Sequence, residues 1–221
     1  MMMRIFLMSY LLCSQVCATS QTLEKHFDSI QAIDIQIDAG QVTIESSEEA
    51  QTSWTQTFDT PQCQAMVDTK DNTLMIKSMA KAQKCEAAYR ISLPRRSQTK
   101  ILIGGGQITL KDMAAPVTIN MGGGQIQLKN IDADVSIALG HGKITFDANA
   151  LPKAPRTLSL QVGSGDIALF FPTQATAFYK NGHPQMLGGS FSSTVKEVDA
   201  HTCHYIIDVA LPVGSMKVRN Q

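Results

Sequence analysis

The motif His201-Thr202-Cys203-His204 carries side chains that can bind a metal ion. On a β-strand, residues two apart point to the same face, so His201 and Cys203 would share one face while His204 points to the other. A structural zinc site needs four ligands, and no further ligand cluster is evident in the sequence. We therefore interpret Cys203 as a buried or half-buried thiol beside surface histidines, and we expect no metal and no cofactor.

Two glycine-rich segments are similar to nucleotide-binding loops. Residues 140–145 contain the Gly-Lys pair of a phosphate loop, but Ile137 stands where that motif needs its first glycine, and a strand is expected where its helix should begin. Residues 104–106 do not complete a dinucleotide fingerprint, because Thr109 occupies the third glycine position. We expect neither segment to bind a nucleotide.

Acidic residues could provide general acid–base catalysis, as in enzymes that cleave polysaccharides on a β-helix. Asp132, Asp134 and Asp147 lie in expected turns and could gather at one edge of such a fold. Aspartates in turns normally form local hydrogen bonds with the backbone. We expect no catalytic residues, and the polysaccharide-acting enzyme stays as the less favoured alternative.

Residues 1–18 have the pattern of a secretory signal peptide. Arg4 precedes an apolar run over residues 5–13, and the small residues around Cys17 suit cleavage after Ala18, with cleavage after Ser20 as the alternative. A lipoprotein signal is less favoured, since Leu11 and Leu12 precede Cys13 and bulky residues precede Cys17. No later segment has the eighteen or more apolar residues of a membrane span. We expect an exported chain, periplasmic or extracellular.

Export would leave three cysteines in a compartment where disulfides persist. Cys63 and Cys85 flank an expected hairpin with strands near residues 64–69 and 73–79. Closing this loop of about 22 residues would stabilise the chain by roughly 3 kcal/mol. We predict a Cys63–Cys85 disulfide and an unpaired Cys203.

The formal charge of the chain is balanced. It has 19 basic and 19 acidic residues, which gives no global electrostatic basis for binding nucleic acid or anionic lipid. The one local basic cluster, Arg95, Arg96 and Lys100, is interpreted as a solvated turn. The partners expected are an unknown protein or a glycan at the cell envelope, and no nucleic acid.

An internal repeat is the strongest pattern in the chain. Residues 101–110, 119–128 and 137–146 align with a period of 18, and residues 160–169 follow after 23. The five extra residues fall near 149–155, where two prolines indicate a loop. Apolar residues at every second position predict strands with one buried face, and a fixed period predicts stacked repeats.

Each repeat contains a glycine corner between two strand segments. Glycine is expected there because the chain must turn sharply, with positive φ. The predicted corner glycines are Gly104, Gly106, Gly122, Gly124, Gly140, Gly142, Gly163 and Gly165. The outward columns beyond the corners are Gln107, Gln125, Lys143 and Asp166, and then Thr109, Gln127, Thr145 and Ala168, with no carboxylate pair.

The glycine repeat and the preceding run at residues 89–94 resemble the putative-adhesin family of bacterial β-solenoid domains of unknown function, and are similar to adhesin-head domains of Bacteroidetes. The resemblance covers roughly residues 33–171 and implies an all-β, right-handed parallel β-helix with coils of about 18 residues. It carries over no catalytic or binding residue.

The expected organisation divides the chain into five parts. These are a signal peptide (1–18), an N-terminal segment with the first strands (19–53), a strand-rich cap with the hairpin (54–94), glycine-cornered coils (95–171), and C-terminal coils with a second cap (172–221). The expected function is a non-enzymatic, adhesin-like binding module at the cell surface or envelope. A periplasmic scaffold or envelope-stress-related protein is the alternative.

Overall fold

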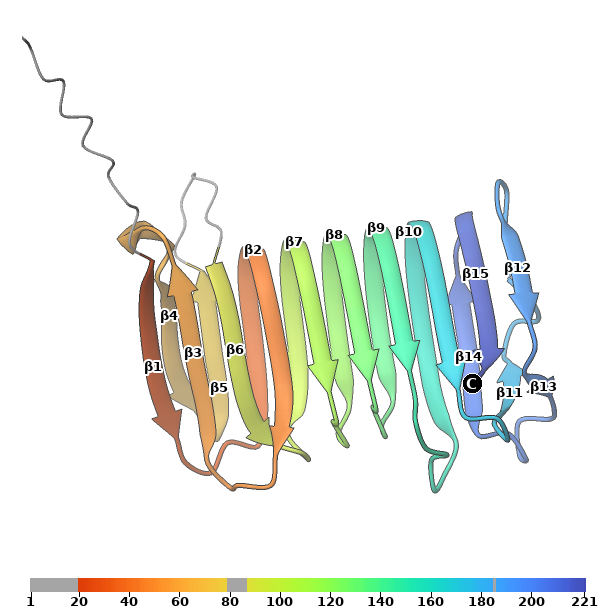
Figure 1. Cartoon of the computed structure of the whole chain (residues 1–221), viewed down its shortest axis with the longest axis horizontal. Coiled ribbons are helices and arrows are strands. Elements are labelled where there is room, and N and C mark those ends of the chain that lie inside the picture. The colour runs from red at the N-terminus through yellow and green to blue at the C-terminus, as the bar shows by residue number, and fades with distance from the viewer. Residues whose placement is uncertain (1–19, 79–86, 185) are drawn as a thin grey trace, which may run out of the picture.

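The computed structural model describes residues 20–78, 87–184 and 186–221. In this part of the chain the secondary structure consists of β-strands and one short 3₁₀ helix, Pro61–Cys63. All fifteen strands belong to one sheet and lie side by side along the long axis of the molecule (Figure 1). The predicted signal peptide, 1–18, lies outside the described residues.

The strands follow the chain in this order: β1 (Gln21–Phe27), β2 (Ala32–Ser47), β3 (Thr52–Phe58), β4 (Ala65–Lys70), β5 (Thr73–Ser78), β6 (Ala87–Pro94), β7 (Gln98–Lys111), β8 (Val117–Lys129), β9 (Val135–Asp147), β10 (Arg156–Phe171), β11 (Thr176–Tyr179), β12 (Ser190–Ser193), β13 (Lys196–Glu197), β14 (Tyr205–Ala210) and β15 (Val213–Asn220).

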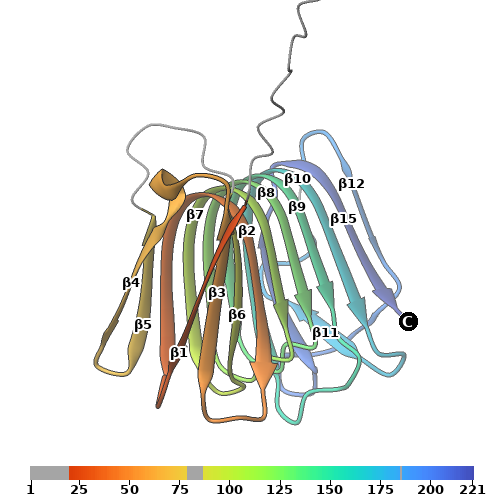
Figure 2. The ribbon, with the colours of Figure 1, turned by 60° about the vertical axis from the view of Figure 1, so that its left-hand side comes forward.

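The five longest strands are bent. β2 and β7 to β10 have 13 to 16 residues each, and they arch over at their middle (Figure 2). We call the part before the bend the first limb and the part after it the second limb. At the two ends of this series each limb pairs with a different strand: β2 with β5 and β6, and β10 with β14 and β15. The two limbs therefore form facing layers.

The pairing register confirms the 18-residue alignment. Ile101 lies opposite Ile119, and Ile119 lies opposite Ile137, so equivalent repeat positions stack directly. Lys143 lies opposite Asp166, which places the five extra residues in the loop before β10. Asp166 accepts a hydrogen bond from the Ser215 hydroxyl and forms no ion pair with Lys143, so that pair marks the register only.

The prediction of a right-handed parallel β-helix is wrong, although the chain is all-β. The sheet is mixed: β7 to β10 pair in parallel, whereas β3 pairs antiparallel with both β1 and β6, and β4 pairs antiparallel with β5. Strands joined by a tight turn can pair only antiparallel. The family resemblance implied parallel pairing throughout the sheet, but β1, β3 and β4 carry no glycine repeat and pair antiparallel.

The first such reversal is the β4–β5 hairpin, which is present as the turn residues predict. Asp71 and Asn72 have φ values of 50° and 57°, the left-handed conformation that a two-residue hairpin turn requires. Cys63 lies just before this hairpin in the 3₁₀ helix. Cys85 lies outside the described residues, so its pairing with Cys63 stays a prediction.

One hydrophobic core runs between the two layers. Alternate residues of both limbs point inward and are buried, as in the Ile108, Ile126 and Ile144 column. Trp54 and Phe58 fill the core at the β1 end, and Phe146, Phe171 and Tyr205 fill it towards the other end. Alternation of buried and exposed residues with a period of two gives a strand one buried face. Each bent strand has this alternation in both its first and its second limb.

The corner glycines are of two kinds. Gly106, Gly124, Gly142 and Gly165 have φ between 130° and 140°, and Gly40 and Gly214 extend this column. The first glycine of each corner is required by close approach instead: a Cβ on Gly122 would lie 2.4 Å from the Gly104 carbonyl oxygen. Positive φ was expected at both glycines, but only the second one in each corner has it.

Candidate functional site

A trough crosses the outer face of the first limbs. It has a volume of about 570 Å³ and runs across β7, β8, β9 and β10 to β14. Its outward side chains come from one residue on each strand, at equivalent repeat positions: Leu102, Asn120, Ala138, Gln161 and Ala210. We call this feature the glycine trough.

The floor of the trough follows directly from the backbone packing. Gly122, Gly140 and Gly163 line it, and each carries a hydrogen atom where any other residue would carry a Cβ. That Cβ would lie 2.3 to 2.5 Å from a carbonyl oxygen of the preceding strand, closer than real Cβ atoms approach. The row of glycines that allows the strands to stack is therefore also the row that hollows the surface.

The glycine trough carries no charge. None of its lining residues is titratable, and the neighbouring outward residues, Thr118, Ser136 and Ser159, are hydroxyl side chains. The charges that flank this face are paired. Lys100 contacts Asp34 at 3.4 Å on the β7 side, and Lys180 contacts Asp208 at 3.3 Å on the β14 side.

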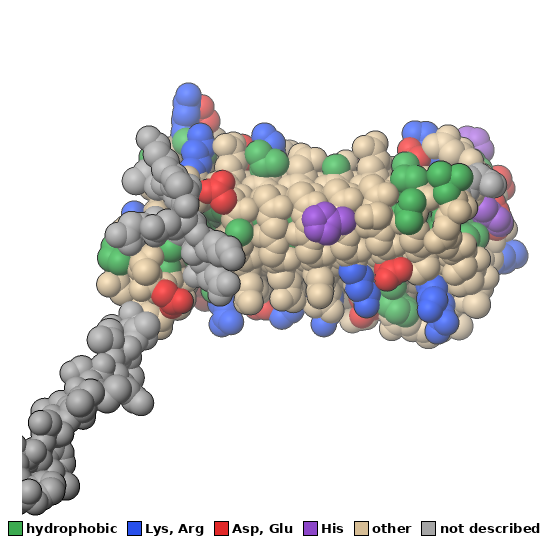
Figure 3. Space-filling model, turned by 90° about the horizontal axis from the view of Figure 1, so that it is seen from above, with side chains coloured by type: hydrophobic (Ala, Val, Ile, Leu, Met, Phe, Trp, Pro, Cys, Tyr) green, Lys and Arg blue, Asp and Glu red, His purple; other side chains and the backbone are tan. Residues whose placement is uncertain are grey.

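The second limbs present a different surface. Gln41, Gln107 and Gln125 stack in register and line a second hollow of about 670 Å³ near the strand bends. Seen from above, the bends are covered mostly by uncharged side chains and backbone (Figure 3). Further along the second limbs, a column of mixed charge includes Lys111, which pairs with Glu45, and Arg219 beside Phe170.

The predicted thiol and histidines do not form a metal site. Cys203 is buried, and its Sγ contacts the Ala200 carbonyl oxygen at 3.5 Å. His204 Nδ1 lies 2.7 Å from the Thr176 hydroxyl, while His201 is exposed. Among the described residues, no group of three or more histidine, cysteine, aspartate or glutamate side chains could hold a metal ion.

The three aspartates suggested for catalysis each have a local partner. Asp132 is paired with Arg156, Asp134 accepts a hydrogen bond from the Thr157 backbone N–H at 2.8 Å, and Asp147 accepts one from the Gln221 side chain at 2.8 Å. These contacts hold strand ends and loops together. The geometry does not join the three carboxylates into an acid–base pair.

Sequence reasoning missed the glycine trough. The signal was present, because Asn120 and Ala138 recur at the repeat spacing two residues before Gly122 and Gly140. The two outward columns considered from the sequence lie on the second limbs, after the bend, and the first limbs were treated only for their inward residues. The part of the chain that the structure describes has no helix long and apolar enough to cross a membrane.

No family model matches the chain, and no curated protein matches it. Solved structures that match the chain include a putative cell adhesion protein from Clostridium sporogenes, 13% identical, with a TM-score of 0.49, covering 92% of this chain and 100% of that one. A putative adhesin from Parabacteroides distasonis is 11% identical, with a TM-score of 0.33 and coverage of 93% and 98%. A putative lipid binding protein from the same species is 9% identical, with a TM-score of 0.34 and coverage of 93% and 98%.

These neighbours agree with the resemblance to putative adhesins inferred from the glycine repeat. At such identities and TM-scores they assign no function. None of the three is described as an enzyme.

Proposed function

We propose that this chain is a non-catalytic, adhesin-like binding module of the cell envelope that holds an extended, uncharged glycan. The observation that carries the proposal is the glycine trough, an uncharged hollow that crosses five strands. The trough runs across the strands, so a linear chain lying in it would cross one strand every 4.8 Å or so.

The lining suits a neutral sugar chain. Asn120 and Gln161 offer amide donors and acceptors for hydroxyl groups, and both side chains are exposed. Leu102, Ala138 and Pro212 offer apolar surface for the C–H faces of sugar rings. An acidic or basic polymer would find no opposite charge in the trough.

A binding role fits the lining better than catalysis does. A general acid or base must lie within hydrogen-bond reach of the bond that reacts. The residues that line the trough include no aspartate, glutamate, histidine, lysine or cysteine. We therefore expect purified protein to hold no stoichiometric zinc or calcium and to turn over no polysaccharide. Metal analysis with a panel of polysaccharide substrates tests this, and either stoichiometric metal or robust turnover would contradict it.

The proposal has two further parts, export of the chain and a disulfide bond. The support for export is the pattern of residues 1–18, and the pairing of Cys63 with Cys85 follows from the oxidising compartment that export implies. Cell fractionation and non-reducing peptide mapping test the two statements. A crosslinked peptide containing Cys203 would contradict the pairing, and retention in the cytoplasm would contradict export.

The test of the trough uses a matched pair of substitutions on β9. Ala138→Arg places a long cation in the centre of the trough, whereas Thr145→Arg places the same side chain on the outer face of the second limb. We expect wild-type protein to bind neutral linear glycans on an array, Ala138→Arg to lose about tenfold or more in affinity, and Thr145→Arg to bind normally.

Equal losses in the two variants would show that the trough is not the binding surface. Capture of a protein partner with no neutral glycan bound would contradict the proposed ligand class. Circular dichroism of both variants checks that each retains the fold.

A further inference from the structure

A separate pocket lies at the edge where the loops connect the strands. It has a volume of about 270 Å³, the share of roughly nine water molecules in the liquid. Its polar lining residues come from four successive connections and from the start of β14, and the loop before β10 also supplies an apolar wall, Ala148, Ala150, Leu151 and Pro152. We call it the loop-edge pocket, and the residues used below are Arg95, Asp112, Asn130, Asp132, Leu151 and Tyr205.

Tyr205 is a fixed and unpartnered donor at this pocket. The residue is 1% exposed, and its ring stacks on Phe171 at a centroid distance of 4.2 Å and meets Phe146 edge-on at 6.2 Å. Within the described residues its hydroxyl forms no hydrogen bond, although the residue lines the pocket. Burial, together with Asp132, raises the pKa of Tyr205 to about 12, so the hydroxyl keeps its proton at neutral pH.

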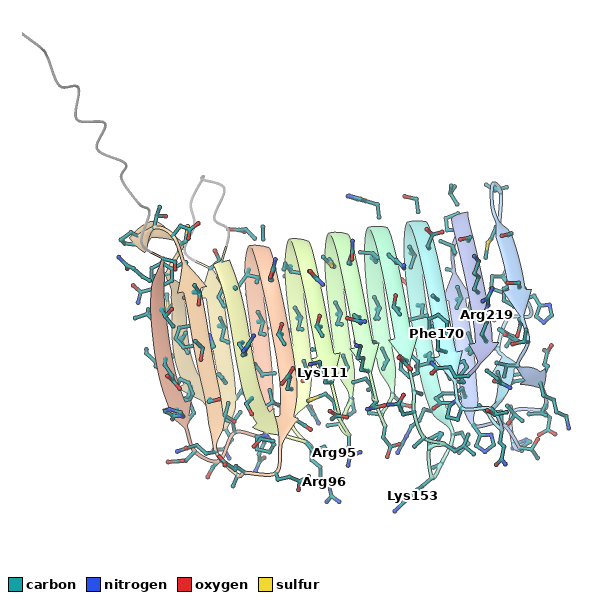
Figure 4. The ribbon with its side chains drawn as sticks, viewed as in Figure 1. Arg95, Arg96, Lys111, Lys153, Phe170 and Arg219 are labelled. Carbon is teal, nitrogen blue, oxygen red and sulfur yellow. The ribbon has the colours of Figure 1, made fainter. Side chains whose placement is uncertain are left out.

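Among the described residues that line the pocket, Arg95 is the one cation. Arg156 donates a hydrogen bond from Nε to Asp132 Oδ1 at 3.0 Å, and its Nη2 forms an ion pair with the same oxygen at 2.9 Å, so this pair is mutually neutralised. Arg95 is exposed, and its guanidinium has no acidic partner among the described residues. Arg95, Arg96 and Lys153 all lie at the loop edge (Figure 4).

The lining also holds acceptors suited to hydroxyl groups. Asp132 Oδ2 accepts no hydrogen bond from the described residues, because the hydrogen bond and the ion pair with Arg156 both involve Oδ1. Asp112 Oδ1 accepts from the Asn130 side-chain amide at 3.0 Å, and its second oxygen accepts no hydrogen bond from the described residues. Leu151 and Ile131 supply apolar surface on the wall and floor.

We propose that the loop-edge pocket binds a carboxylate-bearing sugar, such as a uronic acid unit. Arg95 would pair with the ligand carboxylate, the Tyr205 hydroxyl would donate a hydrogen bond into the pocket, and Asp132 would accept from a sugar hydroxyl. The site is distinct from the glycine trough and does not depend on it.

The charge balance favours a carboxylate over a phosphate. Asp112 lies in the same lining as Arg95 and forms no ion pair with the described residues, so a group with a double negative charge meets more repulsion than a single carboxylate does. A guanidinium matches the two oxygens of a carboxylate with two parallel hydrogen bonds. A simple acid such as acetate would leave the Asp132 acceptor and the apolar wall unused.

The experiment is an NMR titration of the folded chain with glucuronate, glucose, acetate and inorganic phosphate. We expect glucuronate to bind about tenfold or more tightly than glucose, which has no carboxylate. Arg95→Gln should weaken glucuronate binding by about 10- to 100-fold, and Tyr205→Phe by about 2- to 10-fold. Arg96→Gln is the matched control, because Arg96 is adjacent and exposed but does not line the pocket, and it should bind normally.

Stability separates a binding role of Tyr205 from a structural one. Since its hydroxyl has no partner, Tyr205→Phe should leave the unfolding midpoint in urea unchanged while it weakens binding. A lowered midpoint with unchanged binding would overturn the assignment, as would equal binding of glucose and glucuronate, or phosphate binding in place of glucuronate. Ala138→Arg should leave glucuronate binding intact, so failure of this site and failure of the glycine trough are distinguishable.

Discussion

The three consecutive glycines of the first corner allow the packing argument to be tested with one substitution at adjacent positions. In Gly106→Ala, the new Cβ would lie 2.0 Å from the Gly40 carbonyl oxygen, and the residue has a φ of 130°. In Gly105→Ala, the nearest atom to the new Cβ is the Gly123 carbonyl oxygen at 3.5 Å, an ordinary contact. The two variants differ in backbone strain and contact, not in the side chain added.

The expected loss at Gly106 has two parts. Holding a non-glycine residue at this φ costs about 1 to 3 kcal/mol. Moving β7 away from β2 to relieve the contact weakens at least one backbone hydrogen bond, which is worth about 0.5 to 1.5 kcal/mol. Together they lower the free energy of unfolding by about 1.5 to 4.5 kcal/mol. Gly105→Ala should change it by less than about 1 kcal/mol, and could raise it, because alanine restricts the unfolded chain.

Urea unfolding followed by circular dichroism measures both values, provided the slope m stays the same in the two variants. Equal losses at Gly105 and Gly106 would refute the argument that backbone approach requires glycine at specific corner positions. A larger loss at Gly105 would mean that the register between β2 and β7 is wrong.

Three further predictions concern buried polar groups. Gln56→Leu should destabilise the chain by about 2 to 4 kcal/mol, because Gln56 donates to the Cys63 carbonyl oxygen at 2.6 Å and accepts from the Ala65 N–H at 2.9 Å. The control Gln51→Leu, at an exposed position, should cost less than about 0.5 kcal/mol in the same urea assay. Cys203 should resist thiol reagents at neutral pH until urea unfolds the chain, because burial both shields it and raises its pKa; fast labelling of folded protein would contradict this. Burial raises the pKa of Tyr89 and Tyr205 to about 12, above the value of about 10 in an unfolded chain. Their contribution to stability is therefore complete below pH 10 and is lost as the pH rises towards 12, by at most about 2.7 kcal/mol per pH unit for the two groups together. Unfolding free energies measured from pH 9 to 12 test this, and a flat profile would refute it.

The repeat could be read from the sequence because its cause is local and periodic. Inward residues such as Ile119 and Ile137 recur at the repeat spacing, and each must meet the same neighbour in the strand before it. A shift by one residue would turn every apolar side chain outward, so the register is strongly specified. The Asp71-Asn72 turn is equally local, and it defines the hairpin without reference to distant parts of the chain.

The pairing of the first strands could not be read in this way. β1, β3 and β6 carry no glycine corner, and the alternating pattern of β3 and β6 suits a parallel or an antiparallel neighbour equally well. The order β1-β3-β6-β2 places β6 between β2 and β3, although β2 precedes β3 directly in the chain. The pairing partner of each of these strands depends on the tertiary structure and not on a local pattern, which is why the β-helix prediction failed for this part of the chain.

The sequence by itself determined the all-β composition, the register of β7 to β10 and the glycine positions, since each follows from a short-range pattern repeated along the chain. Only the tertiary structure decided the mixed sheet and the surfaces that can bind. The loop-edge pocket joins Arg95, Asp132 and Tyr205, which are separated by up to 110 positions and belong to no shared motif. They meet because the stacking of strands brings the strand ends to one edge of the molecule. Which residues become neighbours at that edge depends on the order of strands in the sheet, and no local sequence pattern encodes that order.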